Sequence, residues 1–262
     1  MDAAAAYAQL RQFPKALKLY DRVLDITPND LDVMATRARI YQAQGNLPEA
    51  AKLLSEINWQ TPAHGATFEA KINQLLLERN DGEAIRLLQT RLAQFHFNSE
   101  VEKANNQVTL AVVQLFDGDV VGAKVTAQQV RNTLEQFYKD QPDNGAVMLP
   151  LSAAYAVMGK KDLALEVAEH LIMVFRARSP LSERLMQESM ASILPMVGEN
   201  SRAISILTEL LQKPYWSPYY GPAPITQALL RLDPMWDPLR GDPAFQKLCE
   251  EKQGLTTNPP SH

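Results

Sequence analysis

A repeat with a period of 34 residues constrains the fold of this chain more than any other feature. Five pairs of similar residues share this spacing: Tyr7 and Tyr41, Ala16 and Ala50, Tyr20 and Leu54, Val23 and Ile57, and Pro28 and Pro62. The same frame, extended by a further 34 residues, reaches Phe68, Leu75, Ala84 and Leu88. Units of this length bury their apolar faces only by stacking on one another. The sequence therefore predicts an extended array of repeats.

Later units are longer but keep the same organisation. The small residue that opens each second helix moves from Ala84 to Ala123, Ala164 and Ala203, at intervals of 39, 41 and 39 residues. Apolar residues recur every three or four positions, which is typical of helices, and no run of alternating β-branched residues suggests a strand. Each unit contains a turn signal; the expected turns are Gly45-Asn46, Asp81-Gly82, Gly118-Asp119, Gly159-Lys160 and Gly198-Glu199. We predict an all-α fold of about six helix pairs.

The fifth unit, LSAAYAVMGKKDLALEVAEHL, carries a late aromatic at Tyr155, a turn glycine at Gly159 and a small residue at Ala164. With the first-helix small residues Ala38, Ser152 and Ala191, and with Pro28 and Pro62, this pattern resembles the tetratricopeptide repeat family. Departures occur where the family usually has tryptophan, here Met34, Phe68 and Met148, and at His96 in place of the third closing proline. The resemblance implies a right-handed α-solenoid of antiparallel helix pairs whose first helices line a concave, partner-binding face.

The repeat frame divides the chain into an array and a C-terminal segment. Expected repeats span residues 1–28, 29–62, 63–97, 98–142, 143–179 and 180–213. The first is truncated in this frame, which suggests that the chain is part of a longer polypeptide. Residues 214–253 are expected to form a Pro/aromatic connector and capping helices, with Trp216 and Trp236 covering the apolar end of the last repeat. A disordered tail is expected at 254–262.

The stretch LLRLDPMWDPLRGDPAFQKL looks like the end of tetratricopeptide regions in large bacterial signalling proteins. In those proteins the repeats follow a Ser/Thr protein kinase, a nucleotide cyclase or a winged-helix regulator domain. This resemblance implies that the chain is the C-terminal arm of such a protein.

Projection of the repeat frame gives a set of candidate partner contacts on the concave face. These are Asp32, Arg39, Gln42, Glu69, Asn73, Asn105 and Glu188. The alternative is that these polar residues only keep an exposed helical face soluble. Some members of the family clamp a terminal carboxylate with Lys, Asn and Arg; only Arg39 and Asn73 match that pattern, so we do not predict such a clamp.

Composition and motifs restrict the function further. The 26 Lys and Arg residues against 30 Asp and Glu residues give a net charge of -4, which argues against a nucleic-acid partner. A single cysteine, Cys249, fits a reducing cytoplasm, and we find neither an export signal nor an apolar run long enough for a membrane span. No catalytic, cofactor-binding or metal-binding motif is present, and the four histidines are widely separated.

The leading hypothesis is a protein-interaction module that binds a peptide or a partner domain, including its own upstream domain, in the concave groove. Two alternatives stay open. One is a small-molecule-sensing regulatory domain with an apolar pocket near the connector. The other is an enzyme assembled in the groove, which would need a cluster of titratable groups that the sequence does not indicate.

Overall fold

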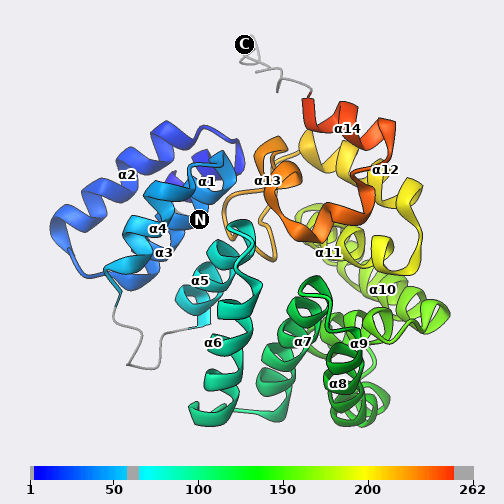
Figure 1. The fold of residues 1–262 in the computed structure, drawn as a ribbon. Helices are drawn as coiled ribbons and strands as arrows, with labels where there is room; N and C mark the ends of the chain where they lie inside the picture. The colour runs from blue at the N-terminus through cyan, green and yellow to red at the C-terminus, as the bar shows by residue number, and fades with distance from the viewer. Residues whose placement is uncertain (1–2, 58–64, 251–262) are drawn as a thin grey trace.

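The computed structural model describes residues 3–57 and 65–250. Within these residues, six antiparallel helix pairs follow one another along the chain (Figure 1). The pairs are α1 (Ala3–Gln9) with α2 (Phe13–Ile26), α3 (Leu31–Gln44) with α4 (Leu47–Ser55), α5 (Gly65–Leu77) with α6 (Asp81–Gln94), α7 (Glu100–Phe116) with α8 (Val120–Asp140), α9 (Gly145–Val157) with α10 (Lys161–Arg176), and α11 (Pro180–Ile193) and η1 (Leu194–Val197) with α12 (Asn200–Leu211). The predicted all-α solenoid is confirmed.

Small residues lie where the paired helices cross. The residues that open the second helices are fully buried: Ala16, Ala50, Ala84, Ala123, Ala164 and Ala203 are each 0% exposed. The small residues of the first helices, Ala38, Ser152 and Ala191, are also 0% exposed. The repeat frame predicted that these residues are equivalent, and their common burial confirms it. A short side chain at each crossing lets two helix backbones approach closely.

The turns between paired helices use a left-handed residue, and glycine supplies it in four repeats. These are Gly45, Gly118, Gly159 and Gly198, with φ between 73° and 88°. The expected Asp81-Gly82 turn is wrong: Gly82 lies inside α6, and Arg79 takes the left-handed position with φ of 59°. Arg11, at φ of 56°, does the same in the first repeat, so Arg11, Gly45 and Arg79 are equivalent residues 34 positions apart.

After α12 the chain turns back toward the first repeats. Residues 212–226, which we call the connector, lead into α13 (Gln227–Leu232), and then come η2 (Pro234–Leu239) and α14 (Pro243–Glu250). Helix α13 packs against α3, and in Figure 1 it lies between the first repeats and the last. The Thr226 hydroxyl donates to the Ala43 carbonyl at 2.6 Å. Contacts of this kind close the curved array on itself.

Arg11 makes the second connection between the first repeat and the connector. Its guanidinium donates to the carbonyl oxygens of Lys213, Leu210 and Ile225, each at 3.0 Å. Arg79 forms an equivalent tie from the third repeat, with a two-pronged ion pair to Asp237 in η2. The two arginines at left-handed turns therefore hold the C-terminal segment against the repeats.

The two tryptophans of this segment have different environments. Trp236 is 1% exposed in the core beside the last repeat, whereas Trp216 is 45% exposed. Pro62, His64 and the tail at 254–262 lie outside the described residues. None of the described helices combines the length and the apolar character that a membrane crossing requires.

Candidate functional site

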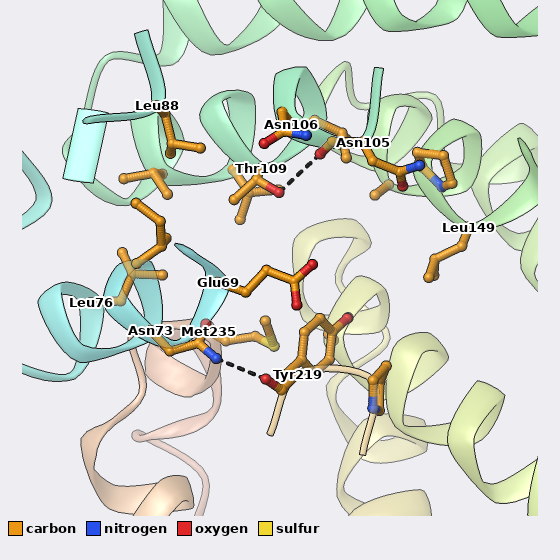
Figure 2. A pocket seen from close by; sticks show the side chains of 18 of the residues that line it. Glu69, Asn73, Leu76, Leu88, Asn105, Asn106, Thr109, Leu149, Tyr219 and Met235 are labelled. Carbon is orange, nitrogen blue, oxygen red and sulfur yellow. Dashed lines mark hydrogen bonds between the residues drawn. The ribbon is translucent and has the colours of Figure 1, made fainter. Parts of the chain in front are cut away.

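A cavity of about 420 Å³ lies at the centre of the closed array. Its walls come from the first helices α5, α7 and α9, from the second helix α6, from the end of α11 with η1, and from the connector and η2 (Figure 2). Much of the lining is apolar, including Ile72, Leu76, Val108, Val112, Leu149 and Met196. The first helices carry these residues because each repeat turns the same face toward the axis of curvature.

Polar side chains form one part of this cavity's wall. Glu69 and Asn73 lie on α5, and Asn105, Asn106 and Thr109 lie on α7. Figure 2 shows Glu69 pointing into the cavity, with Asn105 and Thr109 on the opposite helix. An apolar cavity with a few polar groups is the usual composition of a ligand site, and its volume falls within the range of about 300–1,000 Å³.

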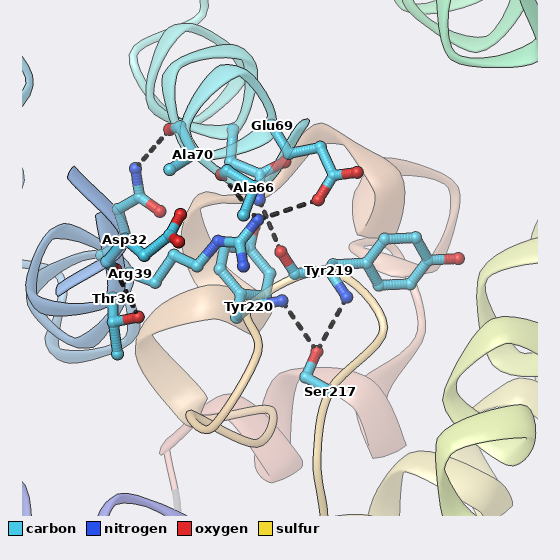
Figure 3. A network of polar contacts seen from close by, with 11 residues as sticks. Asp32, Thr36, Arg39, Ala66, Glu69, Ala70, Ser217, Tyr219 and Tyr220 are labelled. Carbon is cyan, nitrogen blue, oxygen red and sulfur yellow. Dashed lines mark hydrogen bonds and ion pairs between the residues drawn. The ribbon is translucent and has the colours of Figure 1, made fainter. Parts of the chain in front are cut away.

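The connector closes one side of the cavity through a tight turn at residues 217–221. Ser217 and Gly221 exchange backbone hydrogen bonds of 2.7 and 3.1 Å, and Gly221 has φ of 61°. The Ser217 hydroxyl accepts from the backbone amides of Tyr219 and Tyr220 (Figure 3). Asn73 then donates to the Tyr219 carbonyl at 2.8 Å, which fixes the turn on α5.

Arg39 lies beside this turn and is only 8% exposed. Its guanidinium donates to the Ala66 carbonyl and to Glu69, both at 2.9 Å (Figure 3). A Cβ atom at Gly221 would lie 3.2 Å from Arg39 Nη1. Glycine therefore allows the turn both its left-handed conformation and its close approach to the arginine.

Two buried carboxyl groups lie beneath the connector. Burial raises the pKa of Glu188 on α11 to about 7, although its polar neighbours Tyr215 and Ser217 act in the opposite direction. The Ser217 hydroxyl donates to Glu188 Oε1 at 3.0 Å. Burial also raises the pKa of Asp233, whose Oδ2 accepts from the Tyr220 hydroxyl at 2.7 Å. These acids tie the connector to α11 and to the start of η2.

The seven predicted contact residues do not share one surface. Asp32 and Glu69 are exposed, and Asn73 and Asn105 are half-buried. Of these four, Glu69, Asn73 and Asn105 line the cavity, whereas Asp32 lies at the start of α3 outside it.

The expected exposure of Arg39, Gln42 and Glu188 is wrong. Arg39 is buried beside the connector, and Glu188 is 0% exposed beneath it. Gln42, also 0% exposed, donates to the Ala70 carbonyl at 2.9 Å and to Gln74 at 3.1 Å, because α3 and α5 pack together at this position. The prediction treated the concave faces of the first helices as exposed to solvent. At these three residues a neighbouring helix or the connector covers that face.

Sequence reasoning missed Arg11, Arg79 and Tyr219. A signal for the two arginines was present, because both occupy the position of Gly45 in the 34-residue frame. An arginine in place of a turn glycine indicates a side chain retained for a contact elsewhere. Nothing comparable marks Tyr219, whose backbone and ring are placed by the folded connector.

Residues 7–75 match the sequence model of the tetratricopeptide repeat family. The match covers most of the first repeat, the second repeat and most of α5. No curated protein matches the chain. The helix pairs continue beyond the matched span with the same buried small residues, up to Ala203 in α12. Residues 7–75 are therefore similar to tetratricopeptide repeats, and the helix pairs that follow continue the same all-helical arrangement.

Proposed function

We propose that this chain is a docking module that binds an extended segment of a protein partner in the central cavity. Tetratricopeptide repeats generally mediate interactions between proteins, and their all-helical fold is typically not catalytic. The observation that supports the cavity as the docking site is its position: it is the part of the concave face that the connector leaves open. Over α3 and the start of α5, the connector and Arg39 occupy that face.

The dimensions of the cavity support a short segment as its occupant. A space of about 420 Å³ admits a few side chains and not a folded domain. Its apolar lining supplies the hydrophobic contact, and its polar groups on α5 and α7 supply orientation. A disordered or extended segment meets these conditions, because it inserts side chains without a surface of its own.

We place this module at the C-terminus of a larger bacterial signalling protein in the cytoplasm. The support is the resemblance of residues 229–248 to the end of such regions after kinase, cyclase or winged-helix domains. In that arrangement a segment of the upstream domain is one natural occupant of the cavity. The reading frame encoded upstream of Met1 tests this context, and an unrelated upstream sequence would contradict it.

A second candidate function is small-molecule sensing, and the closed side of the cavity favours it. Pro218 and Tyr219 of the connector form a wall that an open peptide groove does not need. A metabolite bound there would contact both the repeats and the connector and would stabilise their closure. Thermal-shift screening of the full chain with metabolites tests this function, and no stabilisation by any of them would count against it.

Selection of binding peptides from a random displayed library tests the docking function. Ala153→Phe places an aromatic ring in the cavity from α9, where Ala153 is half-buried. Its matched control is Ala93→Phe, at an exposed position on α6 outside the cavity. We expect enriched peptides that bind the parent chain and the control but lose at least about tenfold in affinity for Ala153→Phe. Equal binding to all three proteins would reject the cavity as the docking site.

A further inference from the structure

The polar wall of the cavity offers hydrogen-bond acceptors, and part of its donor capacity is already used inside the protein. Asn105 Nδ2 donates to the Val101 carbonyl at 2.9 Å, and Asn73 Nδ2 donates to the Tyr219 carbonyl at 2.8 Å. A carbonyl oxygen only accepts, so these partners fix which end of each amide is nitrogen. The Oδ1 atoms of both residues therefore remain as acceptors.

Thr109 and Glu69 extend the same pattern. The Thr109 hydroxyl donates a hydrogen bond to the Asn105 carbonyl at 3.0 Å, which leaves the lone pairs of its oxygen as acceptors. Glu69 uses Oε2 for Arg39 at 2.9 Å, while its side chain is 63% exposed and Figure 2 shows the carboxylate directed into the cavity. An ionised carboxylate only accepts. Four side chains on two facing helices thus present acceptor oxygen atoms, and the remaining donors among them are the second amide hydrogens of Asn73 and Asn105.

The arginines at the cavity do not reverse this pattern. Arg91 is 8% exposed, its guanidinium lies 4.0 Å from the ring centroid of Phe95 and 4.5 Å from that of Phe68, and its Nε donates to Asn106 at 3.1 Å. Arg39 is equally buried and is held by Glu69 and the Ala66 carbonyl. Both cations are engaged by the protein, which leaves the oxygen atoms as the groups that face a ligand.

We propose that the cavity selects a basic side chain, lysine or arginine, of the docked segment. This proposal rests on the docking function proposed above. The aliphatic stem of such a residue packs on Ile72, Leu76 and Val112, and its cationic head donates to the oxygens of Glu69, Asn73, Asn105 and Thr109. An ammonium group brings three donors and a guanidinium brings five, so either matches an acceptor wall.

An acidic side chain fits the same wall poorly. Its carboxylate would move from water to a wall of oxygens from Glu69, Asn73 and Asn105. The two remaining asparagine amide hydrogens would replace only part of the donors that water supplies. A neutral aliphatic side chain would fill the apolar part but would leave these oxygens without a partner. The expected order of affinity is therefore basic, then aliphatic, then acidic.

The test uses four peptides, acetyl-Ala-Xaa-Ala-amide, in which Xaa is lysine, arginine, norleucine or glutamate. Each is titrated into the ¹⁵N-labelled full chain, and side-chain amide signals of Asn73 and Asn105 report binding. We expect these signals to shift with the lysine or arginine peptide, with an affinity at least about tenfold higher than for norleucine. Glu69→Gln should remove most of that preference, whereas Glu209→Gln, at an exposed site on α12, should not.

Equal or tighter binding of the norleucine or glutamate peptide would overturn the proposal, and so would shifts confined to residues outside the cavity. The comparison of norleucine with lysine uses the unaltered chain, so it does not depend on the folding of any variant. Failure of this inference is distinguishable from failure of docking. Displayed peptides that need an open cavity but lack lysine and arginine would overturn the inference alone, whereas the absence of cavity-dependent peptides would reject docking itself.

Discussion

Replacement of Glu188 by glutamine should make the protein more stable at high pH and remove a steep pH dependence. Glu188 is fully buried under the connector, where it accepts a hydrogen bond from Ser217. Its Oε2 atom is buried without a hydrogen-bond partner among the described residues. Tyr215, Asp233 and Arg11 are the titratable groups that act on it. Glutamine keeps the shape of the side chain and stays neutral at every pH.

The size of the effect follows from the raised pKa. The folded-state pKa of about 7 lies above the ordinary value of 4.5, so the folded protein holds this proton more tightly than the unfolded chain does. The stabilisation is complete below about pH 4.5 and is lost as the pH rises toward 7. At about 1.4 kcal/mol per pKa unit, the loss at high pH is about 3 kcal/mol, of which about 2–3 kcal/mol develops between about pH 5 and 8.

Urea unfolding of the parent chain and of Glu188→Gln, measured from pH 5 to pH 8, checks this value. The difference between their free energies of unfolding should move by about 2–3 kcal/mol in favour of the variant as the pH rises. Asp233 is present in both proteins, so its own contribution largely cancels in the difference. Glu209→Gln is the control, because Glu209 is exposed. A difference that stays constant over this pH range would refute the reasoning about the buried carboxyl group.

Three further predictions concern the closure and the packing of the array. Arg11→Ala should lower the free energy of unfolding by about 2–4 kcal/mol, because the guanidinium bonds to three carbonyls are lost. Arg11→Gly should cost about 1–2 kcal/mol less, because glycine accepts the left-handed turn; equal losses by urea unfolding would contradict this account. Ala164→Leu should cost about 1–3 kcal/mol by overpacking a helix crossing, and an unchanged melting temperature would contradict that packing. Gly221→Ala should cost about 1–2 kcal/mol and speed hydrogen exchange of the Gly221 amide, and unchanged exchange would mean that the turn tolerates a side chain.

The repeat architecture was predictable because its determinants are local and periodic. Ala50, Ala84 and Ala164 share a register in the sequence, and each is fully buried at a helix crossing. Four of the turns follow from glycine at the helix end, where φ is positive. The third turn was wrongly predicted at Gly82, the nearest glycine. The 34-residue spacing from Gly45 leads instead to Arg79, which takes the left-handed conformation.

The closure of the array was not predictable from the periodic pattern. Arg11 contacts Ile225 and Thr226 contacts Ala43 across most of the chain, and no spacing in the sequence relates these residues. The predicted concave face assumed an open groove, so it treated Gln42 and Glu188 as exposed. Asn73 lines the cavity, but its amide is bonded to the connector. The repeat spacing predicts which residues of the first helices face inward. It does not predict that the connector folds over part of that face.

Photo-crosslinking of a peptide obtained from the displayed library tests the docking account most directly. A benzophenone side chain at Val112 would lie in the cavity wall on α7, whereas the same group at Ala93 would lie on the outer surface of α6. The account predicts a covalent adduct from position 112 and none from position 93. Adducts from position 93 without any from position 112 would show that the partner binds the outer surface, which would contradict docking in the central cavity.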